Sequence, residues 1–235
     1  MQRAVILAGG KGTRLEPFTT VFPKPLMPLG DTPILEVVLR QLKRSEFEQV
    51  TLAVGHLSEL IEAFFSDGSK LGLALDYVRE DTPLGTAGPL AFIGGLGEPF
   101  LVMNGDVLST LDYGAFLRDH AASGASASIS TFVRQQQIDF GVVAADHDRV
   151  IGYSEKPTTD YLVSMGVYAF SPSVLELVSP GERLDFPDLV ARMLEAQRTV
   201  RSVPFDGYWL DIGRHDDFAQ AQRDFEDRRA DFLGE

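Results

Sequence analysis

"AVILAGGKGTRL", residues 4–15, joins a short apolar run to a loop that contains three glycines, Gly9, Gly10 and Gly12. The apolar residues 4–8 predict a buried strand. Glycines directly after a strand let the backbone approach a ligand closely, and consecutive backbone N–H groups in such a loop bind anions. Lys11 and Arg14 add positive charge. The stretch therefore predicts a strand followed by a loop over a phosphate chain; the simpler alternative is a tight turn with solvated charges.

The segment after this loop is expected to be irregular before the first helix begins. Leu15 stands where the pattern G-x-G-x-x-G needs its third glycine, and the pattern G-x-x-x-x-G-K-[ST] is absent. Pro17 prevents a long helix from starting directly after the glycines, so we expect the first helix near Pro33. Lys24 lies between these two positions, with a proline on each side. It is the second lysine that can bring charge to the loop.

Strand-like runs alternate with helical periodicity along the rest of the chain. The strand-like runs are residues 4–8, 50–54, 74–78, 100–103, 126–133, 141–145, 150–154, 163–170, 200–204 and 208–212. The helix-like stretches are residues 34–42, 57–65, 86–93, 113–122, 172–178, 186–196 and 215–228. This alternation predicts an α/β fold, with a Rossmann-like, mostly parallel sheet and helices on both faces. The strands that crowd between residues 126 and 170 predict a smaller mixed β lobe within one domain.

Composition excludes several classes of protein. The chain has 235 residues, of which 44% are hydrophobic and 23% charged, as in ordinary globular domains. A net charge of −13 argues against a surface for nucleic acid or an anionic membrane. The chain has no cysteine, so it has no disulfide or thiolate metal site, and a cytoplasmic location is expected. The first apolar run is too short for a signal peptide or a membrane span.

Two aspartates follow predicted strands. Asp106 comes after the run 100–103, and Asp211 closes the run 208–212. Ligands of open α/β sheets bind at the carboxyl ends of the strands, which places both aspartates on one rim with the glycine loop. Mg²⁺ takes one or two carboxylates together with phosphate oxygens. The two residues therefore predict a metal–phosphate site, although a turn aspartate at 106 and a helix cap at 211 are alternatives.

No pair of residues stands out as a nucleophile and its base. The four histidines are scattered, and the patterns H-E-x-x-H and G-x-S-x-G and an aspartate-rich calcium loop are all absent. We therefore expect chemistry by positioning and charge stabilisation, without a covalent enzyme intermediate.

Several segments together resemble the sugar-phosphate nucleotidyltransferases. They are "LAGGKGTRL" (7–15) with "PKPLMPLGDTPIL" (23–35), then "PLGTAGPL" (83–90), "NGD" (104–106), "EKP" (155–157) and "YWLDIG" (208–213). The resemblance is greatest to the mannose-1-phosphate and heptose-1-phosphate guanylyltransferase branch. It implies a glycosyltransferase-A-like fold and a single catalytic domain over residues 1–235, without the tail of longer relatives. Residues 1–110 would mainly bind nucleotide, and residues 111–235 would mainly bind sugar phosphate.

The resemblance also implies a reaction and its residues. A nucleoside triphosphate and a sugar 1-phosphate would give an NDP-sugar and pyrophosphate by direct in-line attack, with Mg²⁺ as cofactor. The catalytic residues would be Arg14, Lys24, Asp106 and Asp211, and the two aspartates would hold the metal. The nucleotide-binding residues would be Leu7, Ala8, Gly9, Gly10, Gly12, Thr13, Glu80 and Gly85. The sugar-phosphate-binding residues would be Asn104, Gly141, Glu155, Lys156 and Gly166.

The sequence says less about the nucleobase and the sugar of the substrates than about the type of reaction. Glu80 can only accept hydrogen bonds, which suits the two adjacent donors of guanine and favours GTP over UTP or dTTP. Ser164 and Met165 stand where the family often has Asn-Ala, which implies a different sugar. Alternatives are a uridylyl- or thymidylyltransferase, a non-catalytic nucleotide-sugar-binding regulator, and a nicotinamide-dependent oxidoreductase; the missing third glycine disfavours the last. A homo-oligomer is compatible with the sequence; nucleic acid and membrane are not expected partners.

Overall fold

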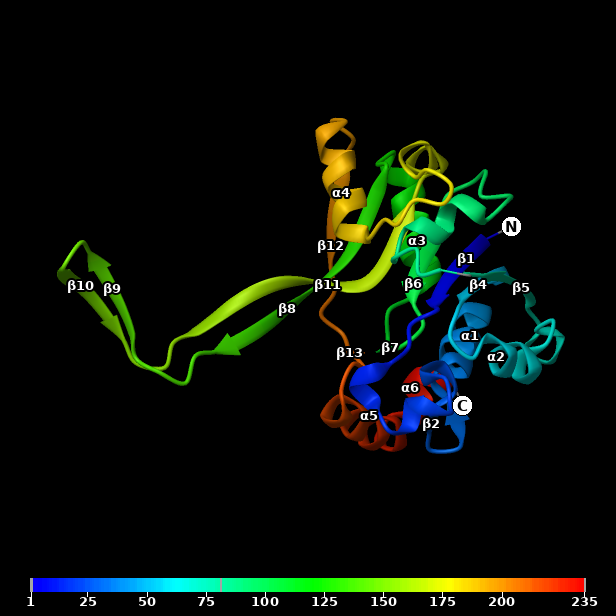
Figure 1. The fold of residues 1–235 in the computed structure, drawn as a ribbon, viewed down its shortest axis with the longest axis horizontal. Helices are drawn as coiled ribbons and strands as arrows, with labels where there is room; N and C mark the ends of the chain where they lie inside the picture. The colour runs from blue at the N-terminus through cyan, green and yellow to red at the C-terminus, as the bar shows by residue number, and fades with distance from the viewer. Residues whose placement is uncertain (1, 81, 235) are drawn as a thin grey trace.

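A central sheet organises the computed structural model, which describes residues 2–80 and 82–234 (Figure 1). Within these residues seven strands pair in the order β12-β8-β11-β6-β1-β4-β5. Among them only β11 runs antiparallel to its neighbours. The mostly parallel sheet that the sequence predicts is therefore confirmed. The strands are β1 (Gln2–Ala8), β4 (Phe47–Val54), β5 (Ala74–Arg79), β6 (Phe100–Asn104), β8 (Ala127–Gln137), β11 (Thr158–Phe170) and β12 (Val200–Pro204).

Helices and short turns cover both faces of this sheet, as the alternation along β1 illustrates. Ala4 and Ile6 belong to one buried cluster, with residues of α1, α2 and α3. Val5 belongs to a second cluster on the opposite face, with residues of α4 and η5. Successive side chains of a strand point to opposite faces, so the apolar run of β1 is buried on both sides. The helices are α1 (Ile34–Arg44), α2 (Ser58–Phe65), α3 (Tyr113–Ser123) and α4 (Phe186–Glu195).

Two segments expected as helices are instead short 3₁₀ turns. The stretch 86–93 contains η5 (Gly88–Phe92), and the stretch 172–178 contains η6 (Pro172–Leu177). A proline lies at the start of each turn and removes a backbone donor there, and each segment is only one or two turns long. Such short segments do not recover the cost of nucleating an α-helix, and the 3₁₀ form is common for them.

The segment between the glycine loop and the first helix is irregular, as predicted. It contains three 3₁₀ turns and a small hairpin before α1 begins at Ile34: η1 (Thr13–Leu15), η2 (Phe18–Thr20), η3 (Lys24–Leu26), β2 (Pro28–Leu29) and β3 (Thr32–Pro33). Of these elements the sequence did not predict the hairpin. The hairpin carries no long apolar run, so periodicity could not reveal it.

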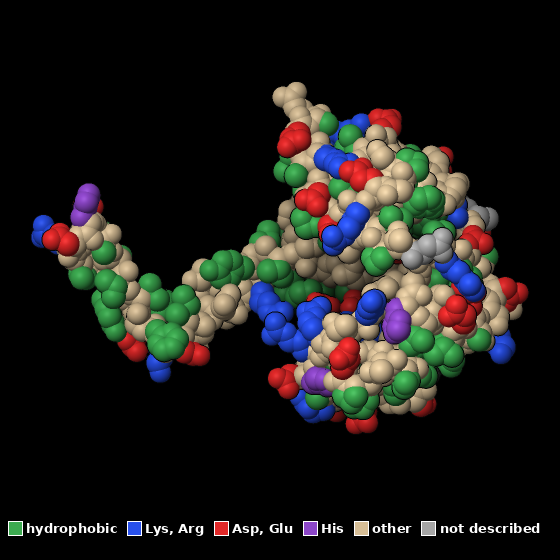
Figure 2. All heavy atoms as spheres, in the orientation of Figure 1, with side chains coloured by type: hydrophobic (Ala, Val, Ile, Leu, Met, Phe, Trp, Pro, Cys, Tyr) green, Lys and Arg blue, Asp and Glu red, His purple; other side chains and the backbone are tan. Residues whose placement is uncertain are grey.

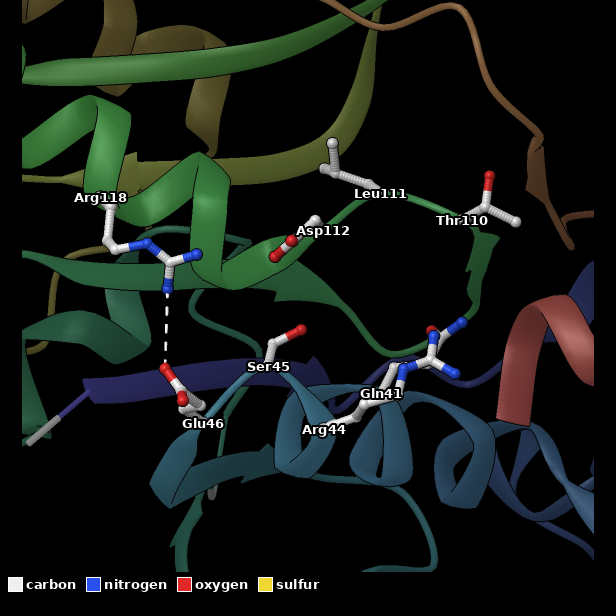
Figure 3. Close-up of a pocket in the computed structure, with 8 residues that line it drawn as sticks. All are labelled: Gln41, Arg44, Ser45, Glu46, Thr110, Leu111, Asp112 and Arg118. Atoms are coloured by element: carbon white, nitrogen blue, oxygen red, sulfur yellow. Dashed lines mark ion pairs between the residues drawn. The ribbon is translucent and has the colours of Figure 1, made fainter. Parts of the chain in front are cut away.

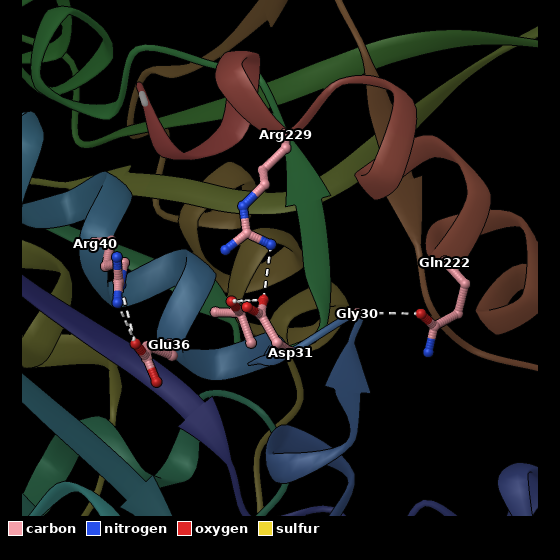
Figure 4. A network of polar contacts seen from close by, with 7 residues as sticks. Gly30, Asp31, Glu36, Arg40, Gln222 and Arg229 are labelled. Atoms are coloured by element: carbon pink, nitrogen blue, oxygen red, sulfur yellow. Dashed lines mark hydrogen bonds and ion pairs between the residues drawn. The ribbon is translucent and has the colours of Figure 1, made fainter.

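The carboxyl-terminal helices α5 (His215–Asp227) and α6 (Arg229–Leu233) pack against this hairpin (Figure 4). Gln222 accepts a hydrogen bond from the Gly30 N–H at 2.9 Å and donates one to the Pro28 carbonyl at 2.6 Å. Arg229 pairs with Asp31 at 2.7 Å. The amino-terminal loop is thus held by residues from the far end of the chain. The sequence predicted α5, but α6 was not expected.

A long arm projects from the body (Figures 1 and 2). It is made by the outer parts of β8 and β11, which continue beyond the sheet as a two-stranded ribbon. At its end lies the hairpin of β9 (Val142–Asp146) and β10 (Arg149–Ser154). These strands match the predicted runs 141–145 and 150–154, and the expected smaller β lobe takes the form of this arm.

A further pair of strands lies beside the central sheet. β7 (Val107–Ser109) pairs antiparallel with β13 (Trp209–Asp211). The sequence predicted the second of these strands, whereas β7 has only three residues and was missed. Among the described residues, no helix is both long and apolar enough to cross a membrane.

Candidate active site

A cleft of about 650 Å³ opens at the carboxyl ends of β1, β4 and β6. Its wall contains most of the residues that the sequence predicted for the nucleotide and catalytic sites: Leu7, Ala8, Gly9, Gly10, Gly12, Arg14, Lys24, Glu80, Gly85, Asn104 and Asp106. These residues come from widely separated parts of the chain. The rule that ligands bind at the carboxyl ends of parallel strands is why the sequence could group them.

The glycine loop faces the open cleft, and Thr19 contacts it from the side away from the cleft. A side chain at Gly10 would meet nothing within 4 Å, so the backbone there faces empty space. Gly12 has φ +65°, and a Cβ there would lie 2.9 Å from the Thr19 side chain. The Thr19 hydroxyl also donates to the Gly12 carbonyl at 2.8 Å. Glycine is therefore required at position 12 by both conformation and space. Thr13 begins η1 and is not part of the cleft wall.

Lys24 is buried at the base of the cleft and forms an ion pair with Oδ2 of Asp106. Its two proline neighbours explain the position, because extended Pro23 and the 3₁₀ turn that contains Pro25 restrict the backbone on both sides. The Lys24 carbonyl accepts a hydrogen bond from the Met27 N–H at 3.0 Å, which closes the turn. The lysine is thus a positive charge with little conformational freedom, held next to a carboxylate.

Asp211 reaches the same place from the other end of the chain. The pairing of β13 with β7 sets Asp211 opposite Val107, directly beside Asp106, and the Ile212 N–H donates to the Asp106 carbonyl at 3.1 Å. Burial raises the pKa of Asp211, and the nearby Asp106 charge raises it further, while Lys24 and Arg14 oppose the shift. Two carboxylates and two cations therefore share one corner of the cleft.

This corner fits a divalent cation. Oδ1 of Asp106 is buried and has no hydrogen-bond partner within residues 2–80 and 82–234, which is unusual for a carboxylate oxygen. The second carboxylate, Asp211, is destabilised as an anion by its surroundings. The described residues contain no group of three or more His, Asp or Glu that could bind a metal. Mg²⁺ needs only one or two carboxylates when phosphate oxygens supply the other ligands, so the pair suits it.

Glu80 lies on the opposite wall and organises a loop. Its Oε2 accepts a hydrogen bond from the Leu84 N–H at 2.9 Å, and burial raises the pKa of the carboxyl group. Next in the loop, Gly85 has φ +79°, and a Cβ there would lie 2.5 Å from the Leu184 carbonyl oxygen. The Thr86 N–H donates to Oδ1 of Asp185 at 3.0 Å. The loop is therefore anchored both to Glu80 and to the start of α4.

Asn104 and Gly166 lie together at the root of the arm. A Cβ on Gly166, which has φ +73°, would lie 2.6 Å from the Asn104 side-chain nitrogen. The Trp209 indole N–H donates to the Met165 carbonyl at 3.0 Å and fixes this part of β11. Asn104 is also part of the cleft wall. The structure therefore brings these two predicted sugar-pocket residues to the edge of the cleft.

The other three predicted sugar-phosphate residues lie on the arm and do not line the cleft. Tyr153 links two of them, because its hydroxyl donates to Oε2 of Glu155 at 2.9 Å and occupies the space beside Gly141. Lys156 follows with φ +44°, a conformation that few residues other than glycine adopt. Gly141, Glu155 and Lys156 thus form one group on the arm. The ribbon of β8 and β11 separates this group from Asp106 and Asp211.

The cleft wall also includes residues that the sequence did not single out as site residues: Lys11, Pro25, Gly55, His56, Pro83, Thr86 and Gly105. His56 lies two residues after the end of β4, and β4 is the neighbour of β1 in the sheet. The same strand-end rule that selected Asp106 could have selected His56.

A second cavity of about 320 Å³ lies between α1 and α3 (Figure 3). Its side chains are polar, and Arg118 there is 3.8 Å from Glu46 in an ion pair. Gln41 donates to the Ser109 carbonyl at 2.8 Å, and Asp112 accepts from the Ala115 N–H at 2.8 Å as the cap of α3. These contacts give the residues of this cavity structural roles, and none of the predicted site residues lines it.

Comparison with known proteins agrees with this geometry. Residues 3–228 match the family described as Nucleotidyl transferase. The chain is 35% identical to mannose-1-phosphate guanylyltransferase of Mycobacterium tuberculosis and 33% identical to UTP–glucose-1-phosphate uridylyltransferase of Synechocystis sp.. Both alignments cover 94% of this chain, but 64% and 62% of those proteins. The chain therefore spans just under two thirds of the length of these relatives.

Solved structures share the fold. HddC from Yersinia pseudotuberculosis is 25% identical, with a TM-score of 0.74 over 96% of this chain and 100% of that chain. A UDP-glucose pyrophosphorylase solved with UDP-glucose has a TM-score of 0.72 at 18% identity, over 97% of this chain and 100% of that chain. The glycosyltransferase-A-like α/β architecture expected from the sequence agrees with these neighbours.

Proposed function

This chain belongs to the Nucleotidyl transferase family, and on that basis we propose that it joins a nucleoside triphosphate to a sugar 1-phosphate. The observation that supports this most directly is the corner where Lys24, Asp106 and Asp211 meet beneath an open glycine loop. With a divalent cation held by its two carboxylates, such a corner would stabilise two phosphorylated substrates at once. The products are an NDP-sugar and pyrophosphate.

The reaction needs no enzyme nucleophile and no general base. A phosphate oxygen of the sugar 1-phosphate, already an anion, attacks the α-phosphorus of the triphosphate. A new P–O bond forms as the bond from the α-phosphorus to the bridging oxygen breaks, and pyrophosphate leaves with that electron pair. The main barrier is the approach of two anions, so positioned positive charge and preorganised donors provide most of the catalysis.

The proposed roles of the residues follow from their places in the cleft and on the arm. Backbone N–H groups of the glycine loop hold the triphosphate, and Arg14 faces the pyrophosphate that leaves. Lys24 contacts the α-phosphate, where charge increases during attack. Lys156 neutralises the phosphate of the sugar, and Glu155 accepts hydrogen bonds from sugar hydroxyls.

Asp106 and Asp211 would hold Mg²⁺. When bound, that ion would neutralise phosphate oxygens and orient the substrates. The unpartnered Oδ1 of Asp106 supports this assignment, because a buried oxygen without a hydrogen bond is a ready ligand. The ion pair with Lys24 uses Oδ2 and leaves Oδ1 free.

Guanine is the base that we propose for the donor. Glu80 uses Oε2 for the Leu84 N–H, while Oε1 points toward Gly9 at the edge of the cleft. A carboxylate oxygen there can accept from N1–H and the amino group of guanine, whereas the carbonyl oxygens of uracil or thymine would be repelled. A mismatched polar edge costs enough for about 100-fold discrimination. The relatives include guanylyl- and uridylyltransferases, so uridylyl transfer is the second candidate.

A pyrophosphate-release assay tests the reaction. We expect release that requires both a nucleoside triphosphate and a sugar 1-phosphate, and that stops when EDTA removes Mg²⁺. Lys24→Ala should abolish it, whereas Lys70→Ala, on the exposed 3₁₀ turn η4 (Ser69–Leu71), serves as the matched control. A covalent nucleotidyl-enzyme formed with triphosphate alone would contradict direct attack. Absence of release with every substrate pair would favour the non-catalytic alternative.

A donor panel tests the base. GTP should give the highest kcat/KM, and mannose-1-phosphate and heptose-1-phosphate are the first acceptors to try. Glu80→Gln keeps an acceptor for the Leu84 N–H but introduces a donor, so it should reduce the preference for GTP. If UTP or dTTP is the better donor in the wild type, or if Glu80→Gln leaves the ratio unchanged, Glu80 serves only to anchor the loop.

A further inference from the structure

The arm leaves the body at the same rim as the cleft, because β8 runs parallel to β6 and both end there. Beyond the sheet, β8 and β11 pair only with each other among the described strands. Seven registered pairs hold them together without a shift, from Thr131 with Ser164 to Gln137 with Thr158. At about 3.3 Å per residue, this ribbon carries the hairpin roughly 20 Å from the body. In this position the ribbon holds Glu155 and Lys156 away from the chain's own cleft.

The hairpin at the end of the arm has one apolar face. In antiparallel pairs, opposite residues share a face, so Tyr153 with Val143 and Val150 with Ala145 lie side by side. The side chains of Val143, Val150 and Tyr153 are 51%, 63% and 67% exposed. The opposite face is more polar: it carries Asp146 paired with Arg149 and Val142 paired with Ser154. Antiparallel sheets with one apolar and one polar face normally bury the apolar one.

The arm gains little stability while this face stays in water. A two-stranded hairpin is at best marginally stable unless it packs on something else. Figure 2 shows hydrophobic side chains along the arm, and such patches on single proteins usually mark contacts with another molecule. The described residues of the same chain provide no cover for it. The cover must therefore come from another molecule.

The positions of the substrate residues indicate which molecule that is. The cleft holds the charges for one phosphorylated substrate, and the arm holds Lys156 and Glu155, which point to a second. The left-handed backbone of Lys156 is a strained conformation of the kind found at binding sites. A substrate site that is divided between the cleft and the arm is complete only when an arm lies against a cleft. A second copy of this chain has such a cleft.

We propose that two copies exchange arms, so that Lys156 and Glu155 of one copy complete the sugar-phosphate half of the other copy's cleft. This inference rests on the proposed function. The exchange is symmetric, so it completes two sites at once and closes the assembly as a dimer. The cleft wall has Lys11, Arg14 and Lys24 beside Glu80 and Asp106, and Lys156 of an arriving arm would add positive charge for the second phosphate.

Complementation between two impaired variants, assayed at a sugar 1-phosphate concentration far below the raised KM of Lys156→Ala, tests the exchange. Lys24→Ala changes the cleft of one chain, and Lys156→Ala changes the arm of the other. The heterodimer of the two variants is isolated with two affinity tags. If arms are exchanged, one of its two sites contains both substitutions and the other site contains neither. We expect about half the wild-type turnover from this heterodimer, far above either parent. If each arm serves its own chain, both sites stay damaged, and a heterodimer no more active than its parents overturns the proposal.

Crosslinking gives a readout that does not depend on turnover. The chain has no cysteine, so single thiols can be introduced cleanly. A Lys156→Cys chain and a Gly10→Cys chain, with tags of different mass, are mixed and treated with a short bis-maleimide. We expect a covalent heterodimer, and none when Lys70→Cys replaces Lys156→Cys. Absence of the heterodimer, or a purely intramolecular link in a chain with both thiols, overturns the exchange. An inactive wild type that still crosslinks would refute the proposed function alone.

Discussion

Lys24 is a buried cation whose charge is balanced by a single carboxylate oxygen of Asp106. At the scale of residues, this contact and the nearby Asp211 form the most unusual electrostatic feature of the molecule. Burial of charge is expensive unless the charges are paired. Here Lys24 and Arg14 face Asp106 and Asp211, so the corner has no net positive charge inside a cleft proposed to bind anions. A divalent cation would make the corner positive, which is the reason for the ion that we propose.

The two aspartates should differ in their effect on stability while sharing an effect on activity. Asp106→Asn and Asp211→Asn should each lower kcat at least about 100-fold, the effect of losing one preorganised electrostatic contact. Without Mg²⁺, Asp106→Asn should lower Tm because it leaves Lys24 without its ion pair. Asp211→Asn should raise Tm, because the surroundings of Asp211 disfavour its ionised form.

The pH dependence follows from the direction of that shift. The folded protein holds a proton on Asp211 to higher pH than the unfolded chain, whose pKa is near the ordinary value of 3.8. Wild-type stability should therefore fall as pH rises from about that value through the raised folded pKa, and the fall should be smaller in Asp211→Asn. Thermal unfolding in EDTA across this range measures it. A lower Tm for Asp211→Asn at neutral pH would contradict the assignment.

The two lysines should affect different kinetic constants. Lys24→Ala should mainly lower kcat, since its contact with the α-phosphate strengthens in the transition state. Lys156→Ala should mainly raise KM for the sugar 1-phosphate, because it contacts a charge that is present throughout. Steady-state kinetics with each substrate varied in turn measures both. The opposite pattern would mean that the two roles are exchanged.

At the scale of elements, the segment around Gly85 is a loop whose shape depends on contacts at both ends. Glu80 holds it at the Leu84 N–H, and Asp185 holds it at the Thr86 N–H. The carbonyl of Leu184 lies where any side chain at Gly85 would have to go. The nucleotide side of the cleft is therefore positioned by α4, which follows it by about a hundred residues.

Gly85→Ala should disturb this loop and the nucleotide site together. The positive φ and the Leu184 contact together should cost more than about 1 kcal/mol. In a chain of this size that is a fall in Tm of roughly 2–4 °C, and KM for the triphosphate should rise. Gly97→Ala is the matched control, since a Cβ there meets nothing within 4 Å. Equal Tm and KM for the two variants would show that the loop tolerates the side chain.

At the scale of the whole molecule, the two ends of the chain stabilise each other. Phe225 of α5 is fully buried in a cluster with Leu15, Leu29 and Phe232. This cluster lies under the amino-terminal loop and beside β13, so it supports both the glycine loop and Asp211. Folding of the carboxyl-terminal helices is therefore a condition for the cleft.

Phe225→Ala should destabilise the protein by about 3–5 kcal/mol, the usual cost of a large cavity in a core. Urea unfolding followed by circular dichroism measures this. Phe92→Ala, at a side chain that is 51% exposed, should cost much less. Similar losses for the two variants would mean that α5 is only loosely attached to the body.

The sequence alone determined the local elements and much of the site. The apolar run of β1, its glycine loop and most helices were predictable because hydrophobic periodicity and glycine and proline positions act over a few residues. The strand-end rule then grouped Asp106 with the loop, and its structural position agrees. The segments 86–93 and 172–178 were predicted as α-helices and are 3₁₀ turns, because periodicity does not report how short a segment is stable.

Only the tertiary structure decided how distant parts meet. The position of Asp211 beside Asp106 depends on the pairing of β13 with β7, a strand of three residues that is too short to show a pattern in the sequence. The position of Gly141, Glu155 and Lys156 depends on the ladder between β8 and β11, whose register results from many contacts far apart in the chain. The order of the motifs in the sequence groups these residues in one site. It does not specify whether all residues of that site come from one chain or from two. Pairing between distant strands is a property of the whole fold, which local preferences constrain only weakly.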